Sequence, residues 1–456
     1  MTVLGRAGAA VIVAWGVALA LFPIYKGLWL GFAPVLMGLG LGAALWRWRS
    51  PLSSWMDRWS NRQFAVAALS MALVARIAAA LYFPLAQSND HEMFYRLAAS
   101  VAGGTGYGWG YGPSAFFPPG LPLLLALWFA VVGIGLWQAK IFGIVLGMVC
   151  VWATYRIADW AFGRMAGRWA LVLAATSPTL VFYSVTVGYE PLLAVVLCGW
   201  AMLTERLESR TASWAPVAAL GVMMGIGTLI KPVCLLLPAV CLVRWLPSLR
   251  LVAVTRAAAA ATILLLVVLP WTMRNWQVLG SPVLVSTNGG VVLYAANNPE
   301  SQGLAMGVAP LPGEHDEVSR DRIRRDAAFA WMLGHPIEWC RLAIAKVVYV
   351  WGTSSSIMSY VSYDRMTTGA ESVAKAVLNV GWSALFVFCW AGTFQAGAWD
   401  RPRFHSAGLG LVYFFVLHLF FEALSRHHIG VMPFLFAIAG AGLQVGVEPR
   451  RSEARA

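Results

Sequence analysis

Charged residues are scarce in this chain of 456 residues. Asp, Glu, Lys and Arg together make up 12% of the sequence, whereas hydrophobic residues make up 59%. Soluble domains usually contain about 25% charged residues, so this composition excludes an ordinary soluble protein and indicates a polytopic membrane protein. Many segments reach the roughly 20 mostly apolar residues that a helix needs to cross a bilayer.

Cysteine is also scarce, and other common signatures are missing. The six cysteines lie mostly inside apolar runs, and no CxxC or other metal-ligand spacing is present, so we interpret them as small buried hydrophobic residues. The formal net charge is +13, but no long Lys/Arg run with interleaved aromatic residues occurs, which argues against nucleic-acid binding. No internal repeat, low-complexity segment or inverted pair of broken helices typical of transporters is visible.

The basic residues lie between hydrophobic segments and predict the topology. Four arginines in the loop 47–63 place this loop in the cytoplasm, because cytoplasmic loops are enriched in Lys and Arg. We predict an all-α membrane protein with about 12 spans and both termini in the cytoplasm. The predicted spans are 8–24, 28–46, 64–83, 138–161, 168–187, 190–205, 213–230, 232–246, 253–273, 374–398, 405–424 and 429–446.

The chain divides into four parts in this topology. They are an N-terminal hairpin with its basic loop (1–63), a core (64–273) with the first outer loop (84–137), an outer region (274–373), and the C-terminal spans with a cytoplasmic tail (374–456). The apolar segments 121–136 and 338–353 would begin and end on the outer side. We therefore expect interfacial helices there, and an amphipathic surface helix at 319–333.

The first long polar interruption runs from residue 88 to residue 122, SNDHEMFYRLAASVAGGTGYGWGYGPSAFFPPGLP. It opens with Asp90, His91 and Glu92, continues as a short helical pattern, and ends in a loop rich in Gly, Tyr and Trp. Asp90 falls in the first turn of the predicted helix, where it could simply complement the helix dipole. A catalytic role for Asp90 is the alternative.

Further polar residues fall at outer helix ends: Glu190, Lys231, Arg274, and the run from Arg426 to His428. Each has a structural explanation, since Glu190 could cap a helix, Lys231 could snorkel to the interface, and Arg274 could end its helix. Their joint position on one face favours a site in which cations bind a phosphate and carboxylates abstract a proton. Adjacent histidines cannot easily face one ion, so we predict no metal site.

Short motifs in these stretches resemble the GT-C glycosyltransferases, specifically the bacterial relatives of protein O-mannosyltransferases and of the lipid A aminoarabinose transferase. They are NDHEMFYRLA with Asp90 and Tyr95, FFPPGLPLLLA, the Glu190–Pro191 pair, MMGIGTLIKP with Lys231, RNWQVLGSPVLVSTNGGVVLYAANNPESQG from Arg274, and SRHHIGVMP. The resemblance extends over roughly residues 64–446. It departs from the family where His91 replaces the usual second acid and where no Lys precedes the loop proline.

The resemblance implies transfer of a hexose or pentose from a polyprenyl-phosphate donor to a lipid, glycan or protein acceptor, on the periplasmic face of a bacterial inner membrane. Asp90 would be the base or would position the acceptor, and Glu190 would orient the sugar or acceptor. The expected phosphate ligands are Lys231, Arg274 and Arg426. The expected substrate-binding residues are Tyr95, His91, Glu92, Tyr107 and His427. Membrane lipids are expected partners and nucleic acid is not; no cofactor is certain, and a divalent cation is possible but not indicated.

A non-enzymatic carrier is the competing interpretation, either a lipid-linked-sugar flippase or a polysaccharide transporter. A carrier should have charged residues near the middle of its spans. The middles of 64–83, 213–230 and 253–273 are nearly free of charge. The sequence therefore favours the enzyme.

Overall fold

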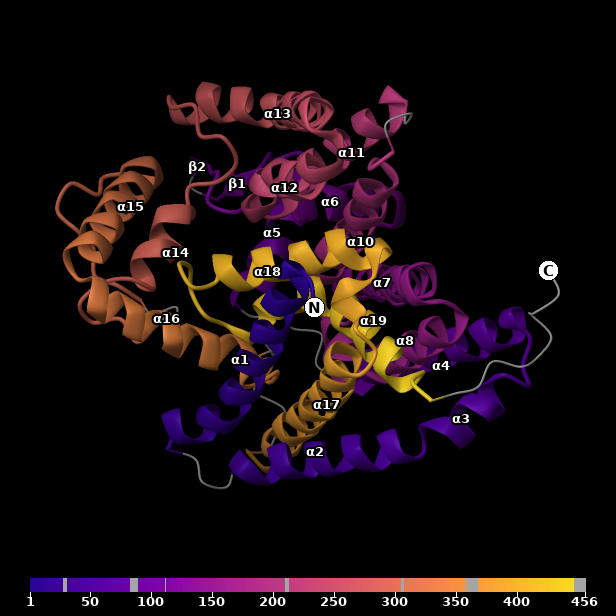
Figure 1. Ribbon diagram of the computed structural model, residues 1–456. Coiled ribbons are helices and arrows are strands. Elements are labelled where there is room, and N and C mark those ends of the chain that lie inside the picture. Colours follow the sequence, from indigo (N-terminus) through magenta and orange to yellow (C-terminus); the bar gives the residue numbers. More distant parts are fainter. Residues whose placement is uncertain are drawn as a thin grey trace.

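The computed structural model describes residues 1–27, 31–82, 89–110, 112–209, 213–304, 307–356, 358 and 368–446. Within them the chain is mostly helical, as predicted (Figure 1). The strands β1 (Gly108–Trp109) and β2 (Gly112–Pro113) form a small antiparallel hairpin in the first outer loop. Residues 83–88, where this loop was predicted to begin, and Tyr111 in its aromatic part lie outside the described residues.

The helices follow the predicted segments closely, mostly to within a few residues. The N-terminal half contains α1 (Val3–Tyr25), α2 (Phe32–Arg47), α3 (Arg49–Met56), α4 (Asn61–Tyr82), α5 (Asn89–Ala102), α6 (Gly120–Val132), α7 (Leu136–Phe162), α8 (Arg164–Thr176), α9 (Pro178–Tyr183), α10 (Glu190–Arg206) and α11 (Trp214–Ile230). The rest contains η2 (Pro232–Leu236), α12 (Leu237–Leu249), α13 (Leu251–Leu279), α14 (Gly289–Ala295), α15 (Glu317–Gly334), α16 (Pro336–Trp351), α17 (Thr368–Phe394), η5 (Ala398–Asp400), η6 (Pro402–Phe404), α18 (His405–Leu417), η7 (Ser425–Val431) and α19 (Met432–Leu443).

In the described part of the chain, six helical segments are long and apolar enough to cross a membrane: Val3–Tyr25, Asn61–Tyr82, Leu136–Phe162, Pro232–Leu249, Leu251–Leu279 and Gly369–Phe394. These segments support an integral membrane protein. The other predicted spans are shorter or interrupted as helices, so the total of 12, the orientation in the membrane and the interfacial position of α6 and α16 stay predictions.

Two predicted spans are not continuous helices. The segment 168–187 is divided at Pro178, whose missing N–H group breaks the helical hydrogen-bond ladder between α8 and α9. The segment 405–424 is helical only to Leu417. Beyond it, the carbonyls of Leu419 and Phe420 accept hydrogen bonds from the Lys346 ammonium group at 3.1 and 3.2 Å. These carbonyls therefore need no helical partner.

Helix α19 is buried on all sides, and α7, α8 and α17 pack around it (Figure 1). An apolar helix that is buried all round is typical of the centre of a bundle. Its neighbours approach very closely. A side chain on Gly440 would lie 2.3 Å from the carbonyl oxygen of Ala166 in α8, and one on Gly442 would lie 2.5 Å from that of Phe388 in α17. Glycine at these positions lets the backbones touch.

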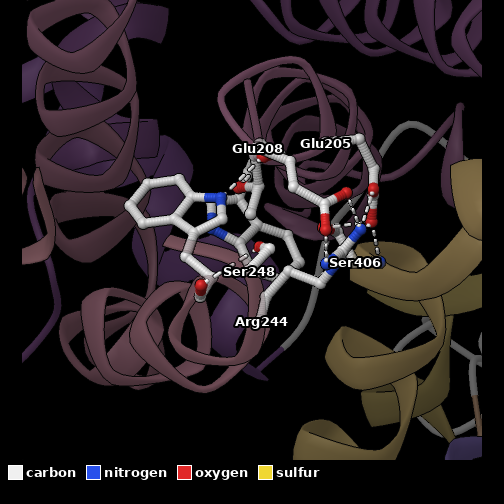
Figure 2. A network of polar contacts seen from close by, with 8 residues as sticks. Glu205, Glu208, Arg244, Ser248 and Ser406 are labelled. Carbon is white, nitrogen blue, oxygen red and sulfur yellow. Dashed lines mark hydrogen bonds and ion pairs between the residues drawn. The ribbon is translucent and has the colours of Figure 1, made fainter. Parts of the chain in front are cut away.

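One end of α10 is fixed by a network of buried charges (Figure 2). The guanidinium of Arg244 in α12 binds both oxygens of Glu205 at 2.9 and 2.7 Å, and it also binds Glu208 at 2.7 Å. Glu205 also accepts hydrogen bonds from the backbone N–H and hydroxyl of Ser406 in α18. The network thus joins α10, α12 and α18, and it lies at the opposite end of α10 from Glu190.

Replacement of Arg244 by Met should lower the free energy of unfolding by about 3–5 kcal/mol, because it leaves the buried carboxylate of Glu205 without its cation. Thermal unfolding of the purified protein in detergent measures the effect. The matched control is Arg58→Met, which removes an exposed arginine and should change stability little. Equal shifts in both variants would show that the network does not stabilise the fold.

The predicted topology can be tested on a native residue. Cys340 in α16 is exposed, whereas the other five cysteines are buried. Since α16 belongs to the predicted outer region 274–373, a membrane-impermeant maleimide should label the wild-type protein in intact spheroplasts, and Cys340→Ser should abolish the labelling. Labelling that requires permeabilised membranes would reverse the predicted orientation.

Candidate functional site

An ion pair joins the first outer loop to the last polar segment of the chain. Asp90 lies in the first turn of α5, and its Oδ2 atom is 2.7 Å from Nη2 of Arg426 in η7. Arg426 is buried, whereas about a third of the Asp90 side chain is exposed. Two of the polar clusters that the sequence placed on one face therefore meet in the folded protein.

A third member of this group, Glu422, was missed in the sequence. Its Oε1 atom lies 3.6 Å from both Arg426 Nη2 and His427 Nε2, and the residue is buried. Glu422 falls inside the segment 405–424, which was interpreted as a span. An ionisable residue inside a predicted span is itself a signal of function, and this signal could have identified Glu422.

Glu190 is the first residue of α10 and is only 2% exposed. Among the described residues, neither oxygen of its carboxylate has a hydrogen-bond partner. A side chain on Gly188 would lie 2.3 Å from Glu190 Oε2 and 3.0 Å from Cε1 of His91, so these two residues flank Gly188 closely. A buried carboxylate without a partner costs free energy, and such groups are candidate functional residues.

His91 is fully buried in α5. Burial and the nearby charge of Arg426 lower the pKa of its imidazole to about 4. His91 is therefore neutral at physiological pH. A neutral imidazole next to Glu190 adds no positive charge to the site.

Lys231 directly follows α11, and its ammonium group donates a hydrogen bond to the hydroxyl of Tyr189 at 3.0 Å. Tyr189 immediately precedes Glu190, so Lys231 lies at the same end of the helices. Burial, followed by the positive charge of Arg426, lowers the pKa of Lys231 to about 8. Lys231 thus carries a charge at neutral pH and loses its proton in mildly basic solution.

Arg274 lies in a different part of the outer region. Its guanidinium donates to the carbonyls of Ser114, at 2.7 Å, and Tyr107, and it lies over the ring of Trp271. In the described structure none of its hydrogen bonds reaches Asp90 or the residues around it. These contacts hold the loop between α5 and α6, and the predicted role of Arg274 as a phosphate ligand stays a prediction.

Tyr107 is likewise engaged within this loop. Its hydroxyl donates to the carbonyl of Phe117 at 2.9 Å, and its ring packs edge-on against Trp271. The loop is also attached to α15, because Glu317 accepts hydrogen bonds from the hydroxyl of Ser114 and the backbone N–H of Ala115. The predicted role of Tyr107 in substrate binding stays a prediction.

The remaining predicted residues of α5 face other directions. Glu92 forms an ion pair with Arg96 at 2.6 Å, one helical turn later, on the exposed side of the helix. The ring of Tyr95 packs edge-on against Phe129 of α6, with their centroids 5.7 Å apart. Their substrate-binding roles stay predictions.

The described site groups the carboxylates of Asp90, Glu190 and Glu422 with the cations Lys231 and Arg426, and these charges affect one another electrostatically. Cations of this kind can hold a phosphate, and the carboxylates can accept a proton. Among the residues that the structure describes, no group of three or more His, Cys, Asp or Glu side chains is arranged to hold a metal ion.

Comparison with known proteins gives two kinds of similarity. Residues 117–273, about a third of the chain, match the family described as dolichyl-phosphate-mannose-protein mannosyltransferase. The fold is similar to that of the archaeal oligosaccharyltransferase AglB from Archaeoglobus fulgidus in complex with an inhibitory peptide and a dolichol-phosphate. That match has a TM-score of 0.52 and 12% identity, and it covers 84% of this chain and 50% of AglB. The apo form of this oligosaccharyltransferase gives a TM-score of 0.50 and 13% identity over the same shares.

ArnT from Cupriavidus metallidurans, bound to undecaprenyl phosphate, matches with a TM-score of 0.43 and 15% identity, over 84% of this chain and 78% of ArnT. A search of curated protein sequences gives no match. The chain spans about half the length of AglB, and at these identities the likeness concerns the fold alone. The protein thus has the fold of the GT-C glycosyltransferases, and its residues 117–273 match the mannosyltransferase family model.

Proposed function

We propose that the protein is a membrane glycosyltransferase that transfers a sugar from a polyprenyl-phosphate donor to an acceptor hydroxyl at the outer face of the membrane. The observation that carries the proposal is the group of Asp90, Glu190, Lys231 and Arg426, which collects at one end of the helices in a GT-C fold. The AglB structure of similar fold holds a dolichol-phosphate, which supports a lipid-phosphate donor.

Lys231 and Arg426 stabilise the phosphate as it leaves. Lys231 offers a compact point charge, whereas Arg426 offers a planar fork whose Nη2 atom contacts Asp90. Negative charge on the phosphate grows as the bond to the sugar breaks, so these cations favour the transition state over the ground state. The phosphate role predicted for Arg274 would require it to release the carbonyls of Ser114 and Tyr107.

Asp90 accepts the proton of the acceptor hydroxyl. The acceptor oxygen attacks the anomeric carbon, the carbon–oxygen bond to the phosphate breaks with its electron pair, and the proton moves to the Asp90 carboxylate. Glu190, which is buried beside His91, orients the sugar or the acceptor. A single attack of this kind inverts the anomeric configuration. Acceptors compatible with this chemistry are lipids, glycans and proteins with a free hydroxyl.

One observation favours the competing carrier function. Arg76 is fully buried within α4, where it donates hydrogen bonds to the hydroxyl of Ser184 and the carbonyl of Ala72. Charged residues inside spans often mark transport pathways. A single buried arginine whose hydrogen bonds are made within the protein is equally consistent with a structural role. The carboxylates grouped around Arg426 favour acid–base catalysis over transport.

Purified protein in liposomes should distinguish the two functions. The substrates are undecaprenyl phosphates that carry a radiolabelled hexose or pentose. A glycosyltransferase releases sugar-free undecaprenyl phosphate and forms a labelled product with a membrane extract as acceptor. A carrier moves the intact lipid across the bilayer without cleavage, and that result would overturn the proposal.

Asp90→Asn should reduce turnover about 100-fold or more, because the amide keeps the shape of the side chain but cannot accept the proton. Protein yield and unfolding temperature are measured alongside, because the variant removes one carboxylate partner of the buried Arg426, and turnover is compared per amount of folded protein. Asp326→Asn, on an exposed carboxylate of α15, is the matched control and should retain wild-type turnover. A loss of only a few-fold at Asp90 would return this residue to a helix-capping role.

The lowered pKa of Lys231 predicts a pH dependence. Lys231 is charged below a pH of about 8 and neutral above it, so affinity for undecaprenyl phosphate should be full below that pH and fall as the pH rises through it. Lys231→Arg should move the fall to higher pH, because arginine stays charged. Binding measurements from about pH 6.5 to about pH 9.5 test this prediction. Identical profiles for the two proteins would show that Lys231 does not bind the phosphate.

A further inference from the structure

Three buried acceptor groups lie together in the segment HLFFEALSRHH, which connects α18 to η7. They are His418, Glu422 and His427, each less than a tenth exposed. The rings of His418 and His427 have their centroids 4.7 Å apart, and Nε2 of His427 lies 3.6 Å from Oε1 of Glu422. The group adjoins the predicted phosphate ligand Arg426, which contacts the same oxygen of Glu422.

Hydrogen bonds to the backbone determine the tautomer of both histidines. Nδ1 of His418 is 2.6 Å from the carbonyl oxygen of Phe414, and Nδ1 of His427 is 3.1 Å from the carbonyl oxygen of Glu422. A carbonyl oxygen can only accept, so Nδ1 carries the proton in each ring. Nε2 of each neutral imidazole is then an acceptor.

The result is a cluster of groups that accept hydrogen bonds. His427 Nε2 and the Glu422 carboxylate face each other as two acceptors, and among the described residues no hydrogen bond uses Nε2 of His418. Protonation of His427 does not relieve this arrangement, because burial and the nearby charge of Lys231 hold its pKa well below the usual value. Burial raises the pKa of Glu422, but the charge of Arg426 opposes this shift and favours the carboxylate form. Such a cluster is satisfied by a ligand that donates hydrogen bonds.

The neighbouring charges select the kind of donor. The positive charge of Lys231 acts on His418, Glu422 and His427, and Arg426 lies within 3.6 Å of Glu422. The carboxylate of Asp90 also acts on Glu190 and Glu422, so cations and carboxylates in this group already offset one another. A neutral hydroxyl group donates the required hydrogen bond without adding a charge to this buried site.

His428, the next residue, shows how a structural histidine differs. Its Nδ1 atom contacts the carbonyl of Val350 at 2.8 Å, its Nε2 atom contacts the hydroxyl of Ser354 at 3.4 Å, and its ring stacks on Trp382 with centroids 3.9 Å apart. Both nitrogens of His428 have protein partners, and the ring is fixed. The Nε2 atoms of His418 and His427 have no such partners among the described residues.

We propose that His418, Glu422 and His427 form a hydroxyl-binding subsite that holds a sugar hydroxyl beside the phosphate-binding cations. This inference rests on the proposed glycosyltransferase function and specifies how its substrate is recognised. The hydroxyl belongs either to the donor sugar or to the acceptor, and the same chemistry serves both. Glu422 and the two histidines position this hydroxyl by accepting its hydrogen bond.

The test uses Glu422→Gln, which keeps the size of the side chain but replaces one acceptor oxygen by an N–H donor. The probes are undecaprenyl phosphate, undecaprenyl-phosphate mannose, and octyl mannoside as a surrogate acceptor. If the donor sugar occupies the subsite, the Kd of undecaprenyl-phosphate mannose rises about tenfold relative to that of undecaprenyl phosphate, which accounts for any effect of Glu422 on Arg426. If the acceptor occupies it, the ratio of the two Kd values is unchanged and the KM for octyl mannoside rises about tenfold.

Two results would overturn the subsite. One is an equal loss of affinity for both lipids with an unchanged KM, which would indicate a phosphate or structural role. The other is no change in either Kd or in KM. Failure of the proposed function would show instead as wild-type protein that binds neither lipid. In that case the thermal shift with free mannose decides, since the subsite predicts stabilisation of wild type but not of Glu422→Gln.

The histidines can be tested without loss of their backbone contacts. His418→Asn and His427→Asn keep an N–H donor near the position of Nδ1 but remove the Nε2 acceptor, and each should reproduce the effect of Glu422→Gln. His335→Asn is the matched control, because Nδ1 of His335 makes the same contact with the carbonyl of Trp331, and His335 is exposed at the end of α15. Glu300→Gln, on an exposed glutamate of the same outer region, controls for the carboxylate change. Both controls should behave as wild type.

Discussion

The ion pair between Arg426 and Asp90 is the contact on which the candidate site depends. A buried guanidinium must be paired, because the free energy of removing its charge from water is large. Arg426 is paired with two acids that lie far apart in the sequence, Asp90 of α5 and Glu422, four residues before Arg426. The pairing of a buried charge thus brings the first outer loop and the last polar turn to the same place.

Glu422 lies in the non-helical turn between α18 and η7, so other parts of the chain must hold this turn. Lys346 of α16 is completely buried and donates to the side chain of Asn297 at 2.7 Å and to the carbonyls of Leu419 and Phe420. Asn297 in turn donates to the same carbonyl of Phe420 at 2.6 Å. Residues of the predicted outer region therefore hold the turn that carries Glu422. The Arg244 network joins α10, α12 and α18 at the other end of α10.

The sequence predicted the grouping of Asp90, Glu190, Lys231 and Arg426 because topology decides on which face of a membrane each helix ends. It could not predict which way a side chain turns. Arg274 and Tyr107 lie on the same predicted face, yet they are occupied with the loop between α5 and α6. Both side chains donate hydrogen bonds to backbone carbonyls, and the positions of these carbonyls cannot be read from the sequence.

His418 and Glu422 were missed for a related reason. The run 405–424 is apolar enough for a span, but α18 ends at Leu417, and the carbonyls of Leu419 and Phe420 beyond it accept hydrogen bonds from Lys346. This lysine lies about 70 positions away in the sequence, so the hydropathy of the run does not reveal the contact. The six long apolar helices, by contrast, follow from local composition, and their ends were predicted to within six residues.

The low dielectric constant of the protein interior makes pairing of buried charges necessary, and it also strengthens the interaction of these charges with a substrate. An electrostatic interaction that is weak in water becomes several times stronger among apolar helices, and charged groups held in place need no reorganisation when charge develops on a substrate. Glu190 is buried with no hydrogen-bond partner for its carboxylate among the described residues, and it lies beside a neutral imidazole and near Lys231. Such a group stabilises a fold less than a well-packed apolar side chain of similar size does. Under the proposed function, a hydroxyl group of the substrate supplies the missing hydrogen bond at the end of α10.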